Sequence, residues 1–333
     1  MNIAILGAGA WGTALAISLS ARHRTTLWTN EADQAEAMSA SRSNQRFLPD
    51  MGLPQELQLS HDLDATLASA ELVLVTVPTS ALRTVLSQVA QSTTPVQVIW
   101  ACKGFEADTA QLPHQVAEET LPHTFPRGVL SGPSFAMEVA RGLPTALTLA
   151  SRDGEFARQT AQALHHARLR IYSSTDVAGV EVGGAVKNVL AIAAGISDGM
   201  GFGHNARAAL ITRGLAEMTR LGLKLGGRVE TLGGLTGAGD LILTCTGDLS
   251  RNRQVGMLLA QQQSLPDILR QLGHVAEGVY TVREVHQLAQ RLGVDMPICA
   301  AVYRVLYEQV PAASAVEDLL SRAPNVEFVK REM

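Results

Sequence analysis

The sequence predicts an α/β part with a mostly parallel sheet, followed by an all-α part. In the first part, short apolar runs alternate with amphipathic stretches, which is typical of βαβ units. From about Val177 onward, convincing strands are rare and apolar residues recur at helical spacing. We therefore expect one domain over residues 1–180 and a helical domain over residues 181–333.

Length and composition agree with this division. The 333 residues correspond to two domains of about 150 residues each. A hydrophobic fraction of 46% against 17% charged residues excludes a chain that is disordered throughout. The net charge of -4 argues against a dedicated nucleic-acid binder. Longer apolar runs fall short of the ~18 residues needed to cross a bilayer, so we expect no membrane insertion.

The first residues do not resemble a targeting signal, although no charged residue precedes Arg22. A positive segment is absent, and Gly7, Gly9 and Gly12 interrupt the apolar run. The three cysteines, Cys102, Cys245 and Cys299, are far apart and odd in number, which predicts reduced thiols in a cytoplasmic protein.

Metal and serine-nucleophile chemistry are both disfavoured. His165 and His166 are adjacent and do not share a helix face, and neither an HExxH pattern nor an Asp-rich loop occurs. The GxSxG pattern of a nucleophile elbow is also missing from the sequence. We expect no metal site.

Six apolar runs predict the strands of the first part, and a helix is expected after the first of them, from Trp11 to Ala21. The strands are Asn2–Leu6, Thr25–Thr29, Leu72–Val77, Val96–Ala101, Gly128–Leu130 and Thr145–Ala150. Five helices are expected in the second part, separated by breakers such as Gly233–Gly239. They are Gly183–Ile196, Asn205–Leu225, Arg251–Gln262, Glu277–Leu292 and Ile298–Tyr307.

A glycine-rich turn of the GxGxxG form follows the first predicted strand and precedes a helix. Gly7 permits a tight turn, Gly9 lets the backbone approach a pyrophosphate, and Gly12 lets helix and strand pack closely. The helix start then offers N–H groups to phosphates. Strand, spacing and helix together favour a Rossmann-type dinucleotide site over a turn without a ligand. Its predicted residues are Gly7, Gly9, Ala10, Trp11 and Gly12.

The end of the second strand bears on which dinucleotide binds. An acid is expected about 20 residues after the glycine loop, to meet the ribose of NAD. Asn30 occupies that place and would not repel the 2′-phosphate of NADP. Arg42 and Arg46 lie downstream and are candidates to meet that phosphate, whereas Glu31 leaves NAD open. The sequence therefore allows NAD or NADP.

Lys187 lies in an otherwise apolar helical segment, next to Asn188. Burial lowers the pKa of a lysine and makes it a usable proton donor or acceptor. The alternative is a lysine whose stem packs while its head reaches water. A dinucleotide domain upstream favours the catalytic interpretation, because hydride transfer to a carbonyl needs a proton partner. Asn188 is a candidate to orient a polar substrate.

Two further segments carry polar groups. Asp240 ends a glycine-rich stretch and either pairs with Lys187 or a substrate hydroxyl, or caps a helix. Ser250 fits a helix N-cap, with Arg251 in the first turn. A guanidinium at a helix start suits a phosphate or carboxylate, and the alternative is a solvated basic turn.

With these residues in place, the chain resembles the bacterial, soluble NAD(P)-dependent glycerol-3-phosphate dehydrogenases. The resemblance runs in order from Gly7 to about Ala323. Its segments are GAGAWGTALA from Gly7, FLPD from Phe47, VPTSALR from Val77, ACKG from Ala101, SGPSFAMEVARGLPTA from Ser131, GGAVKNVLAIAAGISDG from Gly183, NARAALITRGLAEM from Asn205, LTGAGDLILTCTGDLSRNR from Leu235, VAEGVYTVREV from Val275 and MPI from Met296.

The resemblance implies reversible reduction of dihydroxyacetone phosphate to sn-glycerol 3-phosphate, which feeds phospholipid synthesis. It implies that Lys187 donates the proton, with Asp240 in support. The implied substrate contacts are Lys103, Gly132, Ser134, Lys187, Asp240, Ser250, Arg251 and Asn252. The implied cofactor contacts are Trp11, Asn30, Lys103, Ala136, Arg251, Val275 and Glu277. Many members carry His or Arg where this chain has Asn30, which weakens the case for a strong NADP preference.

Two other functions remain alternatives from the residues alone. A β-hydroxyacid dehydrogenase shares the two-domain plan and the lysine but favours a carboxylate substrate. A non-catalytic dinucleotide sensor would use the helical domain to bind a partner. The large apolar helices of the second part are compatible with a homodimer.

Overall fold

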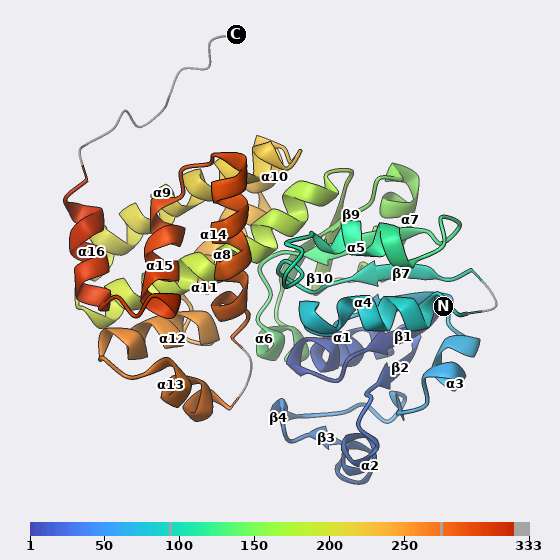
Figure 1. The fold of residues 1–333 in the computed structure, drawn as a ribbon. Coiled ribbons are helices and arrows are strands. Elements are labelled where there is room, and N and C mark those ends of the chain that lie inside the picture. The colour runs from blue at the N-terminus through green and yellow to red at the C-terminus, as the bar shows by residue number, and fades with distance from the viewer. Residues whose placement is uncertain (93–94, 274–275, 323–333) are drawn as a thin grey trace.

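A sheet of eight strands forms the centre of the first part of the protein (Figure 1). The computed structural model describes residues 1–92, 95–273 and 276–322. Along the sheet the order is β10-β9-β8-β7-β6-β1-β2-β5, parallel apart from the antiparallel pair β8–β9. The strands are β1 Asn2–Leu6, β2 Arg24–Trp28, β5 Gln58–Ser60, β6 Leu72–Val75, β7 Gln97–Trp100, β8 Arg127–Ser131, β9 Thr145–Ala150 and β10 Leu169–Ser174. A separate pair joins β3 Ser43–Asn44 to β4 Leu48–Gly52.

Helices cover both faces of this sheet, as the alternating side chains of β1 illustrate. Ile3 and Ile5 belong to one apolar cluster, and Ala4 and Leu6 belong to another on the opposite face. This period of two is that of a strand buried on both sides. The helices of this part are α1 Ala10–Ser20, α2 Ala32–Ser41, α3 Leu63–Ala68, α4 Thr79–Val89, α5 Pro113–Thr120, α6 Ala136–Ala140 and α7 Gly154–Leu164.

The strand order creates a crevice next to β1. The chain leaves β1 for β2 and β5 on one side and then returns to β6 on the other. In open parallel sheets, ligands bind outside the carboxyl ends of the strands at such a reversal. The turn that follows β1, beginning at Gly7, lies at this position.

The second part is built around one buried helix, α8 Val177–Gly199. Its length and apolar composition would allow it to cross a membrane, but 94% of its most apolar window is buried inside the protein. Val177 and Val180 pack with the sheet, whereas residues from Val182 onward pack in the helical core. The remaining helices are α9 Gly203–Lys224, α10 Val229–Leu232, α11 Asp240–Thr246, α12 Arg251–Ala260, α13 Leu265–Leu272, α14 Glu277–Leu292, α15 Pro297–Tyr307 and α16 Ala312–Leu320.

The predicted fold class is confirmed, with corrections to individual elements. The six expected strands, the helix expected after the first of them and the five helices expected in the second part are all present. Their ends differ from the prediction by at most three residues, except that α8 begins at Val177, six residues before the expected Gly183. The edge strands β5 and β10 were not predicted, because their half-exposed residues lack a continuous apolar run. The prediction of a breaker over Gly233–Gly239 is wrong in part, since Leu235–Gly239 forms a π-helical turn. A Cβ on Gly237 would lie 1.9 Å from the carbonyl oxygen of Leu232, so this glycine permits close packing.

Close contact between α8 and α12 yields a stability prediction. A Cβ on Gly256 would lie 2.0 Å from the carbonyl oxygen of Ile192, where no flexible side chain can move aside. We expect Gly256→Ala to lower the free energy of unfolding by about 1–3 kcal/mol or more through overpacking. Urea unfolding measures this. Gly52→Ala is the control, because a Cβ there meets no atom within 4 Å. Equal midpoints for the two variants would contradict the close packing of these helices.

Candidate active site

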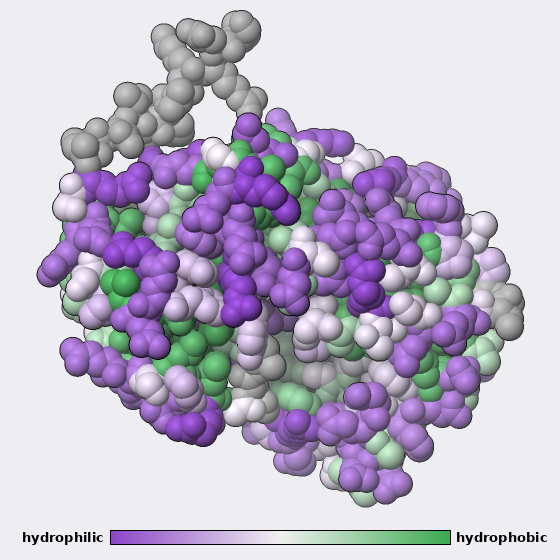
Figure 2. Space-filling view, viewed as in Figure 1, coloured by the Kyte–Doolittle hydropathy of each residue, from purple (hydrophilic) through white to green (hydrophobic). Residues whose placement is uncertain are grey.

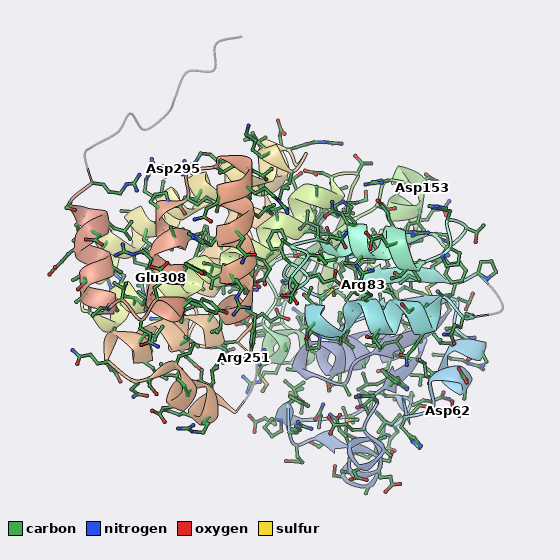
Figure 3. All side chains as sticks on the ribbon, in the orientation of Figure 1. Asp62, Arg83, Asp153, Arg251, Asp295 and Glu308 are labelled. Carbon is green, nitrogen blue, oxygen red and sulfur yellow. The ribbon has the colours of Figure 1, made fainter. Side chains whose placement is uncertain are left out.

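The predicted site residues gather where the helical part meets the carboxyl edge of the sheet. The space-filling view shows the surface hollowed between the two parts (Figure 2). Arg251 lies beside this hollow, at the start of α12 (Figure 3). Lys103, Lys187 and Asp240, which come from segments far apart in the sequence, also meet in this region.

The glycine turn after β1 has the geometry of a dinucleotide cradle. Gly7 has a φ of +117°, and a Cβ on Gly12 would lie 2.0 Å from the carbonyl oxygen of Gly7, so both positions require glycine. A Cβ on Gly9 would meet no atom of the described part of the chain within 4 Å, which leaves open space beside the backbone. Gly9 is the N-cap residue of α1, and because it has no side chain, the first N–H groups of the helix receive no side-chain hydrogen bond there. The first turn of α1 also contains no acidic residue. Phosphate oxygens fit this uncapped helix start.

Other predicted cofactor residues lie around this cradle. Trp11 and Ala136 pack around the same small cluster, which joins α1 to α6. Asn30 is exposed just after β2, next to the turn. Val275 lies outside the described residues.

A buried cluster of three charges connects the two parts. Asp240 is 1% exposed and accepts from Lys187 Nζ at 2.6 Å through Oδ1 and from Lys103 Nζ at 2.7 Å through Oδ2. Lys187 is 8% exposed, so its head does not reach water as the alternative required. Asp240 is not an N-cap, because Gly239 holds that position of α11.

The protonation of this cluster suits proton transfer. Burial lowers the pKa of Lys187 to about 8, although the Asp240 carboxylate opposes the shift. Burial alone would raise the pKa of Asp240, but the ammonium groups of Lys103 and Lys187 hold it below its ordinary value. The result is a charged aspartate beside a lysine that can gain or lose a proton near neutral pH.

Thr244 completes the cluster and was missed from the sequence. Its Oγ1 accepts from Lys187 Nζ at 2.9 Å and donates to the Asp240 carbonyl oxygen at 2.6 Å. The spacing of four residues places Thr244 and Asp240 on one face of a helix, and this signal would have found it.

The turn after β8 approaches Lys103. Lys103 Nζ donates to the Gly132 carbonyl oxygen at 3.1 Å, and Ser134 Oγ donates to the same oxygen at 2.9 Å. Ser131 Oγ is buried and has no hydrogen-bond partner among the described residues, and a Cβ on Gly184 of α8 would lie 2.9 Å from it. Buried hydroxyls normally have partners, so this group is available to a bound ligand.

The start of α12 forms a separate polar end of the site. Ser250 is its N-cap, as predicted, with Oγ accepting from the Arg253 N–H at 3.3 Å. Arg251 is exposed in the first turn. Asn252 Nδ2 donates to Asn188 Oδ1 at 3.0 Å, so the side chain of Asn188 holds Asn252.

Glu277, at the start of α14, lies within the electrostatic reach of this site. Burial raises the pKa of its carboxyl, and three cations oppose this shift: Arg251, Lys103 and Lys187. The structure thus brings together residues predicted separately for substrate and for cofactor.

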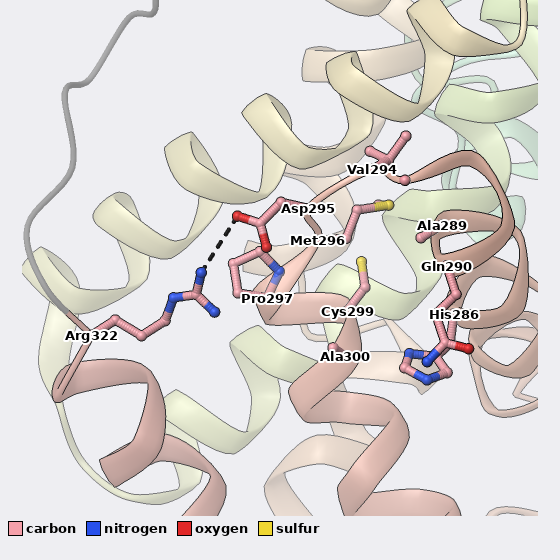
Figure 4. Close-up of a pocket in the computed structure, with 11 residues that line it drawn as sticks. His286, Ala289, Gln290, Val294, Asp295, Met296, Pro297, Cys299, Ala300 and Arg322 are labelled. Carbon is pink, nitrogen blue, oxygen red and sulfur yellow. Dashed lines mark hydrogen bonds and ion pairs between the residues drawn. The ribbon is translucent and has the colours of Figure 1, made fainter.

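A cavity of about 370 Å³ lies elsewhere in the helical part, lined by residues of α14 and α15 and by Arg322 (Figure 4). Asp295, Cys299 and His286 line it, and Arg322 pairs with Asp295 at 3.4 Å. None of the predicted site residues that the structure describes lines this cavity. We therefore do not place the reaction there.

A dinucleotide cradle and a buried lysine–aspartate pair between two domains define an NAD(P)-dependent dehydrogenase. The donor set fits the cofactor, since backbone N–H groups, open space at Gly9 and an uncapped helix start meet at one place.

The chain belongs to the NAD-dependent glycerol-3-phosphate dehydrogenase family. The model of the family's N-terminal region matches residues 2–157, and that of its C-terminal region matches residues 176–317. The glycerol-3-phosphate dehydrogenases (NAD(P)+) of Nitrosospira multiformis and Nitrosomonas europaea are both 61% identical, over 98% of this chain and 100% and 99% of their own lengths. A solved glycerol-3-phosphate dehydrogenase from Coxiella burnetii is 43% identical, with a TM-score of 0.93 over 96% of this chain and 99% of its own.

Proposed function

We propose that this protein catalyses the reversible NAD(P)-dependent reduction of dihydroxyacetone phosphate to sn-glycerol 3-phosphate. The observation that carries the proposal is the buried Lys103–Asp240–Lys187 cluster, in a protein that also has the dinucleotide cradle and an exposed arginine at the start of α12. The cradle suits a dinucleotide cofactor, the cluster suits proton transfer, and the start of α12 suits an anionic group of the substrate. The names of close relatives support the same substrate pair.

Lys187, Asp240 and Thr244 have separate roles in the proposed reaction. When bound, the nicotinamide supplies the hydride. Lys187 donates a proton to the carbonyl oxygen of the ketone during reduction and takes it back during oxidation. Asp240 holds the ammonium of Lys187 in place and balances its charge, and Thr244 fixes the same nitrogen from a second side.

The phosphate of the substrate is assigned to the start of α12. Arg251 offers a planar guanidinium there, and the helix offers N–H groups and the positive end of its dipole. Binding the remote phosphate orients a small ketone and contributes to catalysis at its carbonyl. A β-hydroxyacid dehydrogenase would place a carboxylate here instead, and a sensor would not need the buried lysine.

The full site and its setting are part of this proposal. Substrate contacts are assigned to Lys103, Gly132, Ser134, Lys187, Asp240, Ser250, Arg251 and Asn252. Cofactor contacts are assigned to Gly7, Gly9, Ala10, Trp11, Gly12, Asn30, Lys103, Ala136, Arg251, Val275 and Glu277. The domain boundary is proposed at residues 180/181, which is supported by the packing of Val180 with the sheet and of Val182 in the helical core. The product would supply phospholipid synthesis in the cytoplasm, and the apolar helices of the second part are compatible with a homodimer.

A comparison of substrates tests the proposal. Oxidation of NADH and NADPH is followed by absorbance with dihydroxyacetone phosphate, with unphosphorylated dihydroxyacetone and with a small β-keto acid. Rapid turnover with the phosphorylated ketone alone is expected. Turnover on the keto acid, without turnover on dihydroxyacetone phosphate, would make the protein a hydroxyacid dehydrogenase.

The two directions should depend on pH in opposite ways. Burial lowers the pKa of Lys187 to about 8, so its ammonium form prevails below that pH. Reduction needs the proton, and its kcat/KM should be flat at low pH and fall as pH rises through about 8. Oxidation needs the neutral amine, and its kcat/KM should rise through the same range to a plateau. Profiles measured in both directions check this, and parallel profiles would remove Lys187 as the proton carrier.

A further inference from the structure

The ribose edge of the dinucleotide cradle carries a pair of opposite charges. Glu31 follows Asn30 directly after β2, and the Gly7 N–H at the start of the cradle donates to the Trp28 carbonyl oxygen of β2 at 2.9 Å. The end of β2 therefore lies beside the cradle. In this fold, residues at that position meet the hydroxyls of the adenosine ribose, where NADP differs from NAD by a 2′-phosphate.

Of the two arginines expected to meet that phosphate, Arg42 is committed elsewhere. Its guanidinium donates to the carbonyl oxygens of Pro54 and Leu57, the latter at 3.1 Å. Arg42 also ends α2 in the left-handed region, with a φ of +49°, which directs the chain into the turn that follows. It holds this turn and does not offer a cation to the cradle.

Arg46 is the cation that remains, and Glu31 binds it. Arg46 Nη1 donates to both carboxylate oxygens of Glu31, at 2.9 and 3.1 Å. The guanidinium carbon of Arg46 lies 4.9 Å from the ring centroid of Phe47, which orients the group further. Both charged side chains are more than half exposed, so the pair contributes little to stability and either side chain can be changed safely.

We propose that the Glu31–Arg46 pair makes this enzyme select NADH over NADPH. A 2′-phosphate would have to compete with Glu31 for the Arg46 guanidinium while lying beside the Glu31 carboxylate. The 2′-hydroxyl of NADH carries no charge and can donate to that carboxylate. The inference deepens the proposed function, on which it rests, by naming the residues that choose the cofactor.

Direct binding tests the pair without turnover. Dissociation constants are measured for NADH and NADPH, and for the fragments 5′-AMP and 2′,5′-ADP, by calorimetry. The wild-type protein should bind NADH more tightly than NADPH. Glu31→Gln keeps the size of the side chain but frees Arg46, and should tighten NADPH and 2′,5′-ADP by about tenfold to a hundredfold. Binding of NADH and 5′-AMP should change by no more than about threefold, because the amide oxygen that replaces the carboxylate can still accept from the 2′-hydroxyl.

Two further variants test whether the change in NADPH affinity comes from the Glu31–Arg46 pair or from the loss of any negative charge nearby. Asp33→Asn removes an equal charge from the exposed first turn of α2, close to Glu31, and should not change the ratio of the two affinities. Glu31→Gln combined with Arg46→Met should lose the gain for NADPH, because the freed guanidinium is gone. Equal gains in Asp33→Asn, or a gain that survives the loss of Arg46, would overturn the proposal.

The outcomes also separate this inference from the proposed function. If NADPH affinity shifts in Glu31→Gln but no variant turns over dihydroxyacetone phosphate, the role of the Glu31–Arg46 pair is supported and the proposed substrate is wrong. Turnover of dihydroxyacetone phosphate with an unchanged cofactor ratio in Glu31→Gln would sustain the substrate and reject the pair.

Discussion

Replacing Lys187 with alanine should reduce turnover by ~10²–10⁴-fold while the cofactor still binds. The ammonium is the group that exchanges a proton with the substrate oxygen, and Asp240 keeps it in place at 2.6 Å. Lys103 also donates to Asp240, so the aspartate keeps a partner in the variant. The loss should therefore appear in kcat and leave the dissociation constant of NADH nearly unchanged.

Steady-state rates in both directions and cofactor binding by fluorescence measure this effect. Lys224→Ala is the matched control, because Lys224 is an exposed lysine at the end of α9 in the same part of the protein. Its rates should equal those of the wild type. Turnover close to normal in Lys187→Ala would exclude this lysine from the mechanism, and the proton would need another source.

Asp240→Asn should lower the free energy of unfolding and shift the pH profile of the reduction. The carboxylate is 1% exposed and accepts from two lysines, so its neutralisation leaves two buried or half-buried cations without a counter-charge. Breaking such a pair from one side costs about 3–5 kcal/mol of folding free energy. The carboxylate also raises the pKa of Lys187 against the effect of burial, so its removal should lower that pKa below about 8. The fall in kcat/KM for reduction should then begin at a lower pH than in the wild type.

Urea unfolding and the pH profile of reduction test these two effects separately. Asp248→Asn is the control, because Asp248 pairs with Arg253 at 3.1 Å but its side chain is 98% exposed. A surface pair contributes about 0–1 kcal/mol, so this variant should keep its stability and its profile. An Asp240→Asn protein as stable as wild type, with an unmoved profile, would show that the cluster is not electrostatically coupled.

Local patterns were sufficient for the cradle and for the strand and helix that flank it, whereas helices α2 to α7 were not predicted individually. The turn from Gly7 to Gly12 follows a strand and starts a helix within a dozen residues, so its geometry depends on neighbours in the chain. The same holds for Ser250, whose capping bond reaches only Arg253. The edge strands β5 and β10 could not be predicted from local patterns. They are stabilised by pairing, β5 with β2 and β10 with β9, more than by an apolar pattern of their own.

The sequence by itself determined the two-part fold and the dinucleotide turn, and it predicted a catalytic role for Lys187. Each of these depends on the spacing of residues along one segment. Only the tertiary structure decided which charges meet. Lys103 and Asp240 are 137 residues apart, and Lys187 and Asp240 are 53 apart. The packing of α11 on α8, and of α8 against β8, brings them within hydrogen-bond distance. Their burial there, which lowers the pKa of Lys187, is a property of the assembled core and of no single segment.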